Sequence, residues 1–307
     1  MRNRNESQFK GLRLNASLFL QASAIVLFSL LLSGFGLKKA TTPNNAITGD
    51  QIKACSFNIR LDHAGDGPNN WHKRKAAVAT YIESANLHIV GMQEVLDNQF
   101  QYLKNELNQY KAIGVGREDG LTKGEYAPIF YRDDMFTVLD SGTFWLSETP
   151  DQPSVGWDAA MERICTYAIL KDKRNDREVH FYNTHFDHVG KEARINSAAL
   201  IMDSIAAKSA GHWTILSGDF NVEPNTTAYK TIVQTDLQDS YEQSKVRLGP
   251  TGTFNGFNPN ASHDRRIDYV FFKGFSVKLY ETNNLSYNNN YLSDHFPVIT
   301  LLEYQSH

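Results

Sequence analysis

Short apolar runs alternate with longer segments of helical periodicity from residue 52 to residue 302. The short runs are rich in β-branched and aromatic residues, which favours strands. The predicted strands are residues 52–58, 88–93, 127–131, 136–139, 164–170, 179–184, 213–217, 267–272, 277–281 and 298–302. Because no linker interrupts this alternation, we predict one domain of mixed α/β (α+β) class over residues 51–304.

Three helices are predicted between these strands from apolar residues at helical spacing. The first covers residues 71–85 behind Asn70 as an N-cap, and the second covers residues 100–107 behind Asp97. The third has the clearest apolar stripe, formed by Ile195, Ala198, Ala199, Met202, Ile205 and Ala206. We expect each stripe to pack against the core. The Asn-rich and Gly-rich segments 249–260 and 283–294 are predicted to be loops.

An apolar stretch at residues 16–36 precedes the domain and has basic residues on both sides. A signal-peptide core has about 7–15 residues and a spanning helix about 20, so both a signal peptide and a membrane anchor fit. The small residues Ser33 and Gly34 favour cleavage, whereas the length favours retention. More positive charge precedes the stretch than follows it, which predicts export of the domain. We therefore predict a signal peptide or anchor over residues 1–40 and a linker over 41–50, with the domain periplasmic, extracellular or membrane-anchored outside the cytoplasm.

The composition is that of a globular protein, with 41% apolar and 21% charged residues, which excludes a disordered or multi-span membrane chain. Residues 1–40 hold 6 of the 31 basic and 1 of the 34 acidic residues, so residues 41–307 carry 25 basic against 33 acidic residues, a net charge of −8. Because affinity for nucleic acid comes mostly from basic side chains that displace counterions, an acidic domain disfavours a long DNA-binding surface. Cys55 and Cys165 lie in apolar runs, which predicts buried free thiols, with one disulfide as the alternative.

Polar side chains follow the apolar runs at a recurring position. They are Asn58, Glu94, His185, Asp219, Asn221, Asp268, Asp294 and His295. Ligands of α/β proteins bind at strand ends, so we expect these side chains to form one site. Taken alone, Glu94 fits a loop acid or a helix cap, and Asp219 with Asn221 fits an Asx turn. Asp268 lies between apolar residues, where a carboxylate is costly to bury unless it is paired or metal-bound.

Carboxylate and amide oxygens dominate this set, and they are the ligands that Mg²⁺ or Mn²⁺ prefers. The predicted metal ligands are Asn58, Glu94, Asp219 and Asp294. Such a metal polarises a phosphoryl oxygen, and His295 paired with Asp268 can transfer a proton. The set therefore predicts hydrolysis of a phosphate ester. The residues leave open whether Asp219 or His295 is the formal base.

The motifs that carry these residues resemble those of the endonuclease/exonuclease/phosphatase superfamily, which has the DNase I-like fold. They are SFN with Asn58, MQE with Glu94, NTH with His185, GDFN with Asp219 and Asn221, RIDYVF with Asp268, and SDHFPV with Asp294 and His295. The resemblance covers nearly all of residues 52–302. It implies a four-layer α/β/β/α sandwich with the site where the edges of the two sheets meet.

The same resemblance implies a role for each residue. Catalytic roles fall to His185, Asp219, Asn221, Asp268 and His295. Phosphate contacts fall to Asn58, Tyr131, Arg163, His185 and Asn221. We therefore expect a Mg²⁺- or Mn²⁺-dependent hydrolase that works as a monomer.

Further segments resemble a bacterial group of small metal-dependent hydrolases similar to maltose 6'-phosphate phosphatase. These segments are FNIRLD, WxxR at residues 71–74, GEYAPIFYR, SGTFWLSETP, NTHFDHVG and GTFNGF. Since the loops lack a dense run of Arg or Lys, a small phosphorylated substrate such as a sugar phosphate is favoured. The residues expected to build its pocket are Asp62, His63, Asn69, Trp71, His72, Asp187 and His188. An exported nuclease that binds nucleic acid is the alternative, and a non-catalytic binding module on the same fold is the least favoured.

Overall fold

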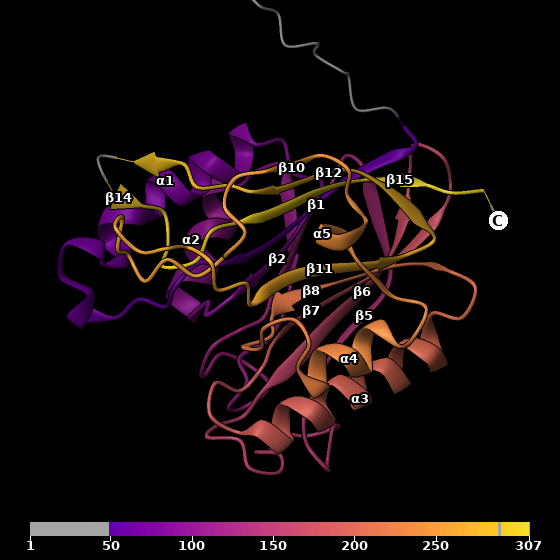
Figure 1. Ribbon diagram of the computed structural model, residues 1–307, viewed down its shortest axis with the longest axis horizontal. Coiled ribbons are helices and arrows are strands. Elements are labelled where there is room, and N and C mark those ends of the chain that lie inside the picture. Colours follow the sequence, from indigo (N-terminus) through magenta and orange to yellow (C-terminus); the bar gives the residue numbers. More distant parts are fainter. Residues whose placement is uncertain (1–48, 288–289, 307) are drawn as a thin grey trace, which may run out of the picture. The chain divides into compact units, whose positions relative to one another are not determined.

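Two large β-sheets lie face to face, with α1 and α2 on one side and α3 and α4 on the other (Figure 1). The computed structural model of the chain describes residues 49–287 and 290–306, and these belong to one compact unit, Ala46–His307. The predicted signal peptide or anchor, residues 1–40, and residues 41–48 of the predicted linker lie outside the described residues. Within the described part of the chain, no helix is both long and apolar enough to cross a membrane.

The first sheet has seven strands in the order β10-β12-β15-β1-β2-β4-β3. Their bounds are β1 Gln51–Asn58, β2 Ile89–Gln93, β3 Tyr110–Ile113, β4 Ile129–Arg132, β10 Arg247–Leu248, β12 Phe275–Thr282 and β15 Val298–Tyr304. β1 and β2 are parallel and in a register that pairs Asn58 with Gln93. Asn58 and the next residue after β2, Glu94, are therefore brought to the same edge of the sheet.

The second sheet has six strands in the order β5-β6-β7-β8-β11-β9. Their bounds are β5 Phe136–Trp145, β6 Ile164–Asp172, β7 Glu178–His185, β8 Trp213–Asp219, β9 Gln238–Asp239 and β11 Asp268–Lys273. β7 and β8 are parallel, with His185 opposite Asp219, and β11 runs antiparallel to β8, with Asp268 opposite Asp219. The register alone thus aligns three predicted site residues at one edge.

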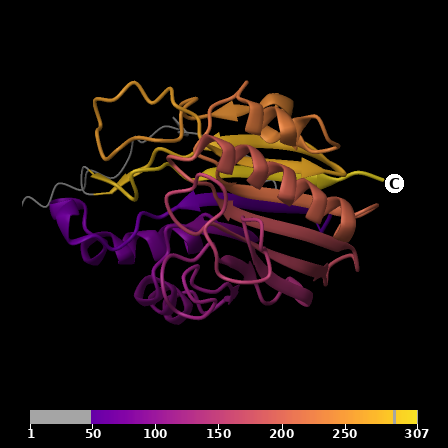
Figure 2. The same cartoon turned by 90° about the horizontal axis from the view of Figure 1, so that it is seen from below.

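Helices cover the outer face of each sheet. The bounds are α1 Trp71–Ser84, α2 Asp97–Glu106, α3 Lys191–Lys208 and α4 Thr227–Val233, with short elements η1 Ala64–Asn69, α5 Ser240–Gln243, β13 Ser286–Tyr287 and β14 Asn290–Tyr291. Figure 2 shows α3 and α4 lying across the outer face of the second sheet. The predicted four-layer α/β/β/α sandwich is confirmed.

Each boundary between layers is filled by buried apolar side chains. Because neighbouring strand residues point to opposite faces, each central strand contributes to two layers. In β1, Ile52 packs between the sheets, whereas Phe57 packs toward α1 and α2. Cys55 lies in the layer under α1 and α2, and Cys165 lies in the layer under α3. Both thiols are buried and free, which confirms the first of the two alternatives for the cysteines.

Several elements differ from those predicted. β5 continues to Trp145, beyond the predicted end at residue 139. A bulge between Val138 and Asp140 shifts its register, and the polar residues after the bulge hide the strand period. The cap of α2 is Leu96, so the predicted cap Asp97 is instead the first helical residue. In α3, Ala199 and Ala206 are exposed, although they were predicted to belong to the stripe that packs against the core. The buried face consists of Ala193, Ser197, Ala198, Ile201, Met202 and Ile205. The predicted loop 283–294 contains the β13–β14 hairpin.

A buried polar layer joins the two sheets below their common edge. Gln93 Nε2 donates to Asn183 Oδ1 at 2.7 Å, and Ser217 Oγ donates to the same oxygen at 3.1 Å. Gly91 lies against this layer, where a methyl group would collide with Ser217 and Asn183. Each of these polar residues lies one or two positions before a predicted site residue. The layer therefore fixes the positions of the strand ends that carry the site and the distance between the two sheets there.

Candidate active site

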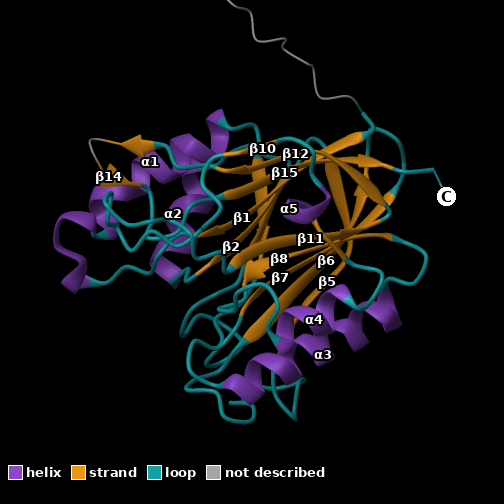
Figure 3. Cartoon of the chain, in the orientation of Figure 1, coloured by secondary structure: helices purple, strands orange, loops and turns teal. Residues whose placement is uncertain are grey.

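A cavity of about 430 Å³ lies at the edge where strands of both sheets end. Figure 3 shows loops gathered at this end of the sheets. The cavity is lined by Arg60, Leu61, Glu94, Glu125, Met161, Arg163, His185, His188, Asp219, Asn221, Phe254, Arg265, Ile267, Asp294 and His295. Of the predicted site residues, the structure brings seven to the wall of the cavity, and Asn58 and Asp268 lie directly behind that wall.

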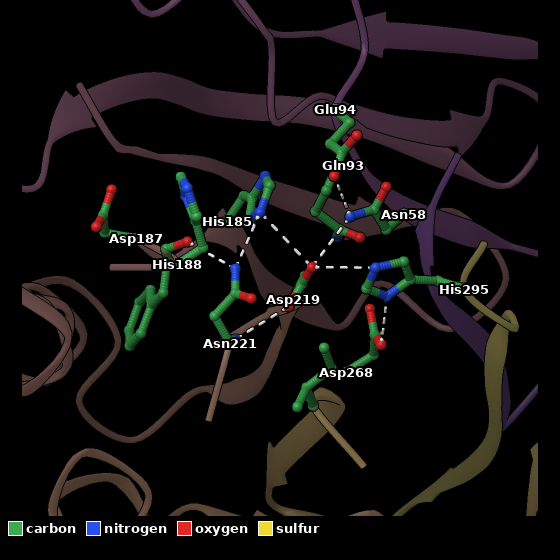
Figure 4. A network of polar contacts seen from close by, with 12 residues as sticks. Asn58, Gln93, Glu94, His185, Asp187, His188, Asp219, Asn221, Asp268 and His295 are labelled. Carbon is green, nitrogen blue, oxygen red and sulfur yellow. Dashed lines mark hydrogen bonds and ion pairs between the residues drawn. The ribbon is translucent and has the colours of Figure 1, made fainter. Parts of the chain in front are cut away.

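Asn58 connects the two sheets directly behind the wall of the cavity. Its side chain is fully buried, and its Nδ2 donates to Glu94 Oε1 at 3.1 Å and to Asp219 Oδ2 at 3.0 Å (Figure 4). Glu94 belongs to the loop after β2 and Asp219 ends β8, so one amide sets the separation of carboxylates from different sheets. Glu94 Oε2 also accepts the backbone N–H of Leu61 at 3.1 Å.

Three residues of the cavity have a backbone conformation that is uncommon outside glycine. Arg60 and Glu94 each have a φ of 59°, and Asn221 has a φ of 50°. Residues in this region carry a strain of order 1–3 kcal/mol each, and such residues gather at active sites. The surrounding hydrogen bonds hold these conformations in place, which supports assignment of this cavity as the functional site.

The carboxylates of Glu94, Asp219 and Asp294 form an acidic end of the cavity. Arg60 lies between two of them, with Nη1 3.6 Å from Glu94 Oε2 and Nε 3.8 Å from Asp294 Oδ2. Arg60 is held by Asp66 through two hydrogen bonds of 3.0 Å. The sequence prediction missed Arg60, although it stands in the FNIRLD segment. The chemistry of the three carboxylates fits a hard divalent cation such as Mg²⁺ or Mn²⁺. The predicted metal ligand Asn58 instead turns its Nδ2 toward Glu94 and Asp219, and its Oδ1 accepts the backbone N–H of Arg60 at 3.0 Å.

A second convergence of possible ligands overlaps the acidic end. The ligand atoms of Asp219, Asp268 and His295 lie within 4.8 Å of one another. Asp268 is already used, however, because its Oδ2 accepts from His295 Nδ1 at 2.9 Å and from Thr253 Oγ1 at 2.6 Å. The geometry therefore favours Asp268 as the partner of the imidazole rather than as a metal ligand.

His295 lies between two carboxylates. Its Nδ1 contacts Asp268, and its Nε2 lies 3.7 Å from Asp219 Oδ2 (Figure 4). Burial lowers the pKa of His295, but the attraction of Asp268 and Asp219 outweighs burial and raises this pKa well above its ordinary value. Burial raises the pKa of Asp219, yet His295 and His185 outweigh it and lower this pKa below its ordinary value. The arrangement favours a charged imidazole beside an ionised Asp219.

His185 forms the other side of the site together with Asn221. Asn221 Nδ2 donates to the carbonyl oxygen of Phe186 at 3.0 Å, which fixes the orientation of the amide, and it lies 3.2 Å from His185 Nε2. His185 Nε2 also lies 3.6 Å from Asp219 Oδ2, and His185 Nδ1 lies 3.6 Å from Glu125 Oε2. His185 and Glu125 thus form a second carboxylate–imidazole pair.

Glu125 is a site residue that the sequence prediction missed. It forms two hydrogen bonds of 2.9 Å with Arg117. Burial raises the pKa of Glu125, but His185, Arg117 and Arg163 outweigh it and lower the pKa to about 2. Glu125 stands in the segment GEYAPIFYR, which resembles the bacterial hydrolase group. It follows no predicted strand, so the pattern of polar residues at strand ends does not identify it.

Arg163 supplies a buried positive charge to the cavity wall. Its Nε donates to Asp187 Oδ2 at 3.2 Å, and its Nη2 lies 3.0 Å from His188 Nδ1. Its third nitrogen, Nη1, is buried and has no hydrogen-bond partner among the described residues. A buried donor without a partner is costly, so this guanidinium retains capacity for an anionic ligand.

Two expectations about individual residues are corrected by the structure. Tyr131 does not line the cavity but packs between the two sheets, because β4 has one buried face toward the second sheet and the other toward the helices. The expected sugar pocket is also different. Of its seven residues only His188 lines the cavity, while Asp187 holds Arg163 from behind and Trp71 is buried in the core.

The Asx-turn alternative for Asp219 and Asn221 describes the local geometry correctly. The backbone N–H of Asn221 donates to Asp219 Oδ1 at 3.0 Å, as in such a turn. Both side chains nevertheless line the cavity. The two interpretations are therefore compatible, since the turn directs the two side chains into the cavity.

Comparison with known proteins agrees with this geometry. The model of the endonuclease/exonuclease/phosphatase family matches residues 55–295. The chain therefore belongs to this family, and the resemblance noted in the sequence is confirmed. Members of the family act on phosphoester bonds, so this chain is a hydrolase of that class.

Three solved structures from Bacteroides cover nearly the same part of the chain. A family member from Bacteroides vulgatus is 43% identical, covers 83% of this chain and 99% of its own, and has a TM-score of 0.80. A family member from Bacteroides thetaiotaomicron is 38% identical, with coverage of 83% and 98% and a TM-score of 0.81. A mannosyl-6-phosphatase from Bacteroides thetaiotaomicron is also 38% identical, with coverage of 82% and 100% and a TM-score of 0.79.

Proposed function

We propose that this protein is a divalent-metal-dependent phosphatase that hydrolyses a phosphate monoester of a small molecule, with a sugar phosphate as the substrate class. One observation carries the proposal. The cavity wall carries the carboxylates of Glu94, Asp219 and Asp294, and it also carries Arg163 and His185, whose Nε2 lies 3.6 Å from Asp219 Oδ2. Such a wall matches a phosphoryl group that contacts a cation held by the carboxylates and accepts hydrogen bonds from the neighbouring side chains.

The acidic end would hold the cation through Glu94, Asp219 and Asp294, and Asn58 Nδ2 holds Glu94 and Asp219 in position. A bound Mg²⁺ or Mn²⁺ would polarise the phosphoryl oxygen and offset the charge that develops on the leaving group. Asp219 is suited to orient the attacking water and accept its proton, because its Oδ1 and Oδ2 are held by Asn221 and Asn58. Of the two candidates for the base, this geometry favours Asp219.

The imidazoles and the guanidinium act on the phosphoryl oxygens. His295 is held by Asp268 and can donate from Nε2, the ring nitrogen that faces Asp219. His185 is oriented by Glu125 and Asn221, and Arg163 has one unused donor. These groups can stabilise a negatively charged transition state without reorganisation, because hydrogen bonds already fix all three.

Support for a sugar phosphate comes from the cavity and from a relative. The cavity volume of about 430 Å³ lies within the ordinary range for small-molecule sites. The rim residues His188 and Arg265 offer polar contacts, and Phe254 offers an apolar face. One relative of 38% identity is a mannosyl-6-phosphatase. We therefore propose a hexose phosphate as the first substrate to test.

Replacing Arg163 tests the wall of the cavity that faces the phosphate. We expect Arg163→Lys to lower kcat/KM by about 10²-fold, because lysine keeps the charge but loses the planar set of donors held by Asp187 and His188. The measurement is kcat/KM for a hexose 6-phosphate, with thermal unfolding as a check of the fold. Arg247→Lys is the matched control, since Arg247 is exposed and lies outside the cavity lining. Equal losses in both variants would contradict the special role of Arg163.

We also propose that the enzyme acts outside the cytoplasm as a monomer. The support is the sequence of residues 16–36, which is apolar and preceded by most of the basic residues of the N-terminal segment. Fractionation of cells that produce the full chain tests the location. Recovery of the activity in the cytoplasmic fraction would refute the proposed export.

A further inference from the structure

A cluster of two imidazoles and one carboxylate lies far from the candidate active site. Glu178 and His180 are at the beginning of β7, and alternation along a strand puts both on the same face. His212 immediately precedes β8, whose first residue, Trp213, pairs with Val179 of β7. His212 is therefore the neighbour of Glu178 on the adjacent parallel strand. The candidate active site lies at the other ends of these two strands, about 23 Å away at the usual rise per residue.

The ligand atoms of this cluster converge. Glu178 Oε1 lies 2.7 Å from His180 Nε2 and 3.4 Å from His212 Nδ1. All three ligand atoms lie within 4.8 Å of one another. The two imidazole rings are stacked, with centroids 4.5 Å apart and an angle of 19° between their planes. The catalytic roles proposed for the active site use none of these side chains.

The buried ring of the cluster is oriented by hydrogen bonds from behind. His180 Nδ1 lies 2.7 Å from Ser209 Oγ, and Ser209 Oγ lies 2.9 Å from the hydroxyl of Tyr182. Ser209 is the C-cap of α3, so the ring is tied to the end of a helix. Histidines that bind a metal commonly use their second nitrogen in this way, which holds the first nitrogen toward the ion.

We propose that Glu178, His180 and His212 bind a divalent transition metal of the zinc type, at a site separate from the catalytic centre. Two imidazole nitrogens and one carboxylate oxygen suit Zn²⁺, whereas Mg²⁺ and Ca²⁺ prefer oxygen ligands. The side chains of Glu178 and His212 are 34% and 40% exposed, so water can reach the site and complete the coordination. The ion would join the beginnings of β7 and β8, and through Ser209 the end of α3.

The separations of the ligand atoms need little change on binding, but the stacked ring of His212 must rotate, because a metal ion lies in the plane of each imidazole that binds it. Metal–ligand bonds of about 2.0–2.1 Å in a tetrahedral site place neighbouring ligand atoms about 3.4 Å apart. The pair Glu178–His212 already has this separation, and the pair Glu178–His180 must widen by less than about 1 Å. The side chains of Glu178 and His212 are both partly exposed, so they have room to make these changes without movement of β7 or β8. Because the ion binds only the folded state, it would raise the unfolding temperature.

Metal titration of the full chain tests this site. Protein freed of metal by chelation is titrated with Zn²⁺ by calorimetry and with Co²⁺ by visible absorption, in the presence of excess Mg²⁺. We expect His212→Ala to bind one equivalent of Zn²⁺ fewer than the unchanged chain and to lose the Zn²⁺-dependent rise in unfolding temperature. His72→Ala is the matched control, because His72 is an exposed histidine outside both sites, and it should behave like the unchanged chain.

Two further variants keep the test decisive. Glu178→Gln should weaken Zn²⁺ binding by at least about 10-fold with the fold intact, whereas Glu94→Gln should leave this equivalent unaffected. Equal Zn²⁺ stoichiometry and affinity in the unchanged chain and in His212→Ala would overturn the proposal. It would also be overturned if Glu94→Gln abolished all Zn²⁺ binding, since the ion would then belong to the catalytic centre. In either case the cluster would be a hydrogen-bonded contact only.

Discussion

Glu94→Gln is expected to lower kcat/KM by about 10²–10³-fold, the range observed when one electrostatic stabiliser of a transition state is removed. Glutamine keeps the size of the side chain, and its single oxygen can accept from one of the two donors that now bond to Glu94, Asn58 Nδ2 at Oε1 or the backbone N–H of Leu61 at Oε2. It loses the negative charge with which Glu94 would hold a divalent cation. The measurement is kcat/KM for a hexose phosphate across a range of Mg²⁺ concentrations, with thermal unfolding in parallel.

The matched control for this variant is Glu118→Gln, which removes the same charge from an exposed residue outside the cavity. It should keep nearly the full rate. Excess Mg²⁺ should restore a small part of the activity of Glu94→Gln. It should not change the rate of the control. Unchanged metal dependence in Glu94→Gln, or full activity of the unchanged chain in chelator, would show that Glu94 holds no essential cation.

His295→Ala is expected to lower kcat/KM by about 10²–10³-fold, which is the usual range for loss of one donor that stabilises the charge of a transition state. Asp268→Asn should also be strongly impaired, because Asp268 Oδ2 holds His295 Nδ1 at 2.9 Å and supports the charge of the ring. Since Asp268 acts through the same imidazole, the double variant should be about as slow as His295→Ala alone. The measurement is kcat/KM for the two single variants and the double variant.

Multiplication of the two losses would contradict this arrangement. Asp268 would then act independently of His295, for example as a ligand together with Asp219, since the ligand atoms of the three residues converge within 4.8 Å. A pH profile separates the alternatives further. If Asp268 works through the imidazole, Asp268→Asn should lower the apparent pKa attributed to His295, because a carboxylate favours the charged ring.

The sequence grouped candidate site residues wherever these lie at an end of a strand. His185 and Asp219 are the last residues of β7 and β8, Asp268 is the first residue of β11, and strand register aligns the three at one edge. The pattern of polar residues at strand ends did not identify Arg60 and Glu125, because both lie in loops. In a loop, no regular spacing of apolar residues indicates which way a side chain points. Their positions depend on ion pairs with Asp66 and Arg117, which only the folded structure reveals.

The limits of the fold prediction also have physical causes. Tyr131 lies on a strand that is buried on both faces, so alternation could not decide which face carries it. β9 and β10 have two residues each, too few to produce a period. The sequence did not predict the buried layer of Gln93, Asn183 and Ser217. A polar residue near the end of an apolar run is typical of a strand end, and only the packing of the two sheets shows that these three side chains bond to one another.

The comparison of small esters with DNA tests the central claim most directly. The experiment measures kcat/KM of the full chain for hexose phosphates, nucleotides and duplex DNA at matched Mg²⁺, before and after chelation, across a series of salt concentrations. We predict the highest kcat/KM for a hexose phosphate, loss of activity in chelator, recovery with Mg²⁺ or Mn²⁺, and weak binding of DNA at physiological salt. Faster cleavage of DNA than of any small ester, with binding that falls steeply as salt rises, would contradict the account and identify the protein as a nuclease.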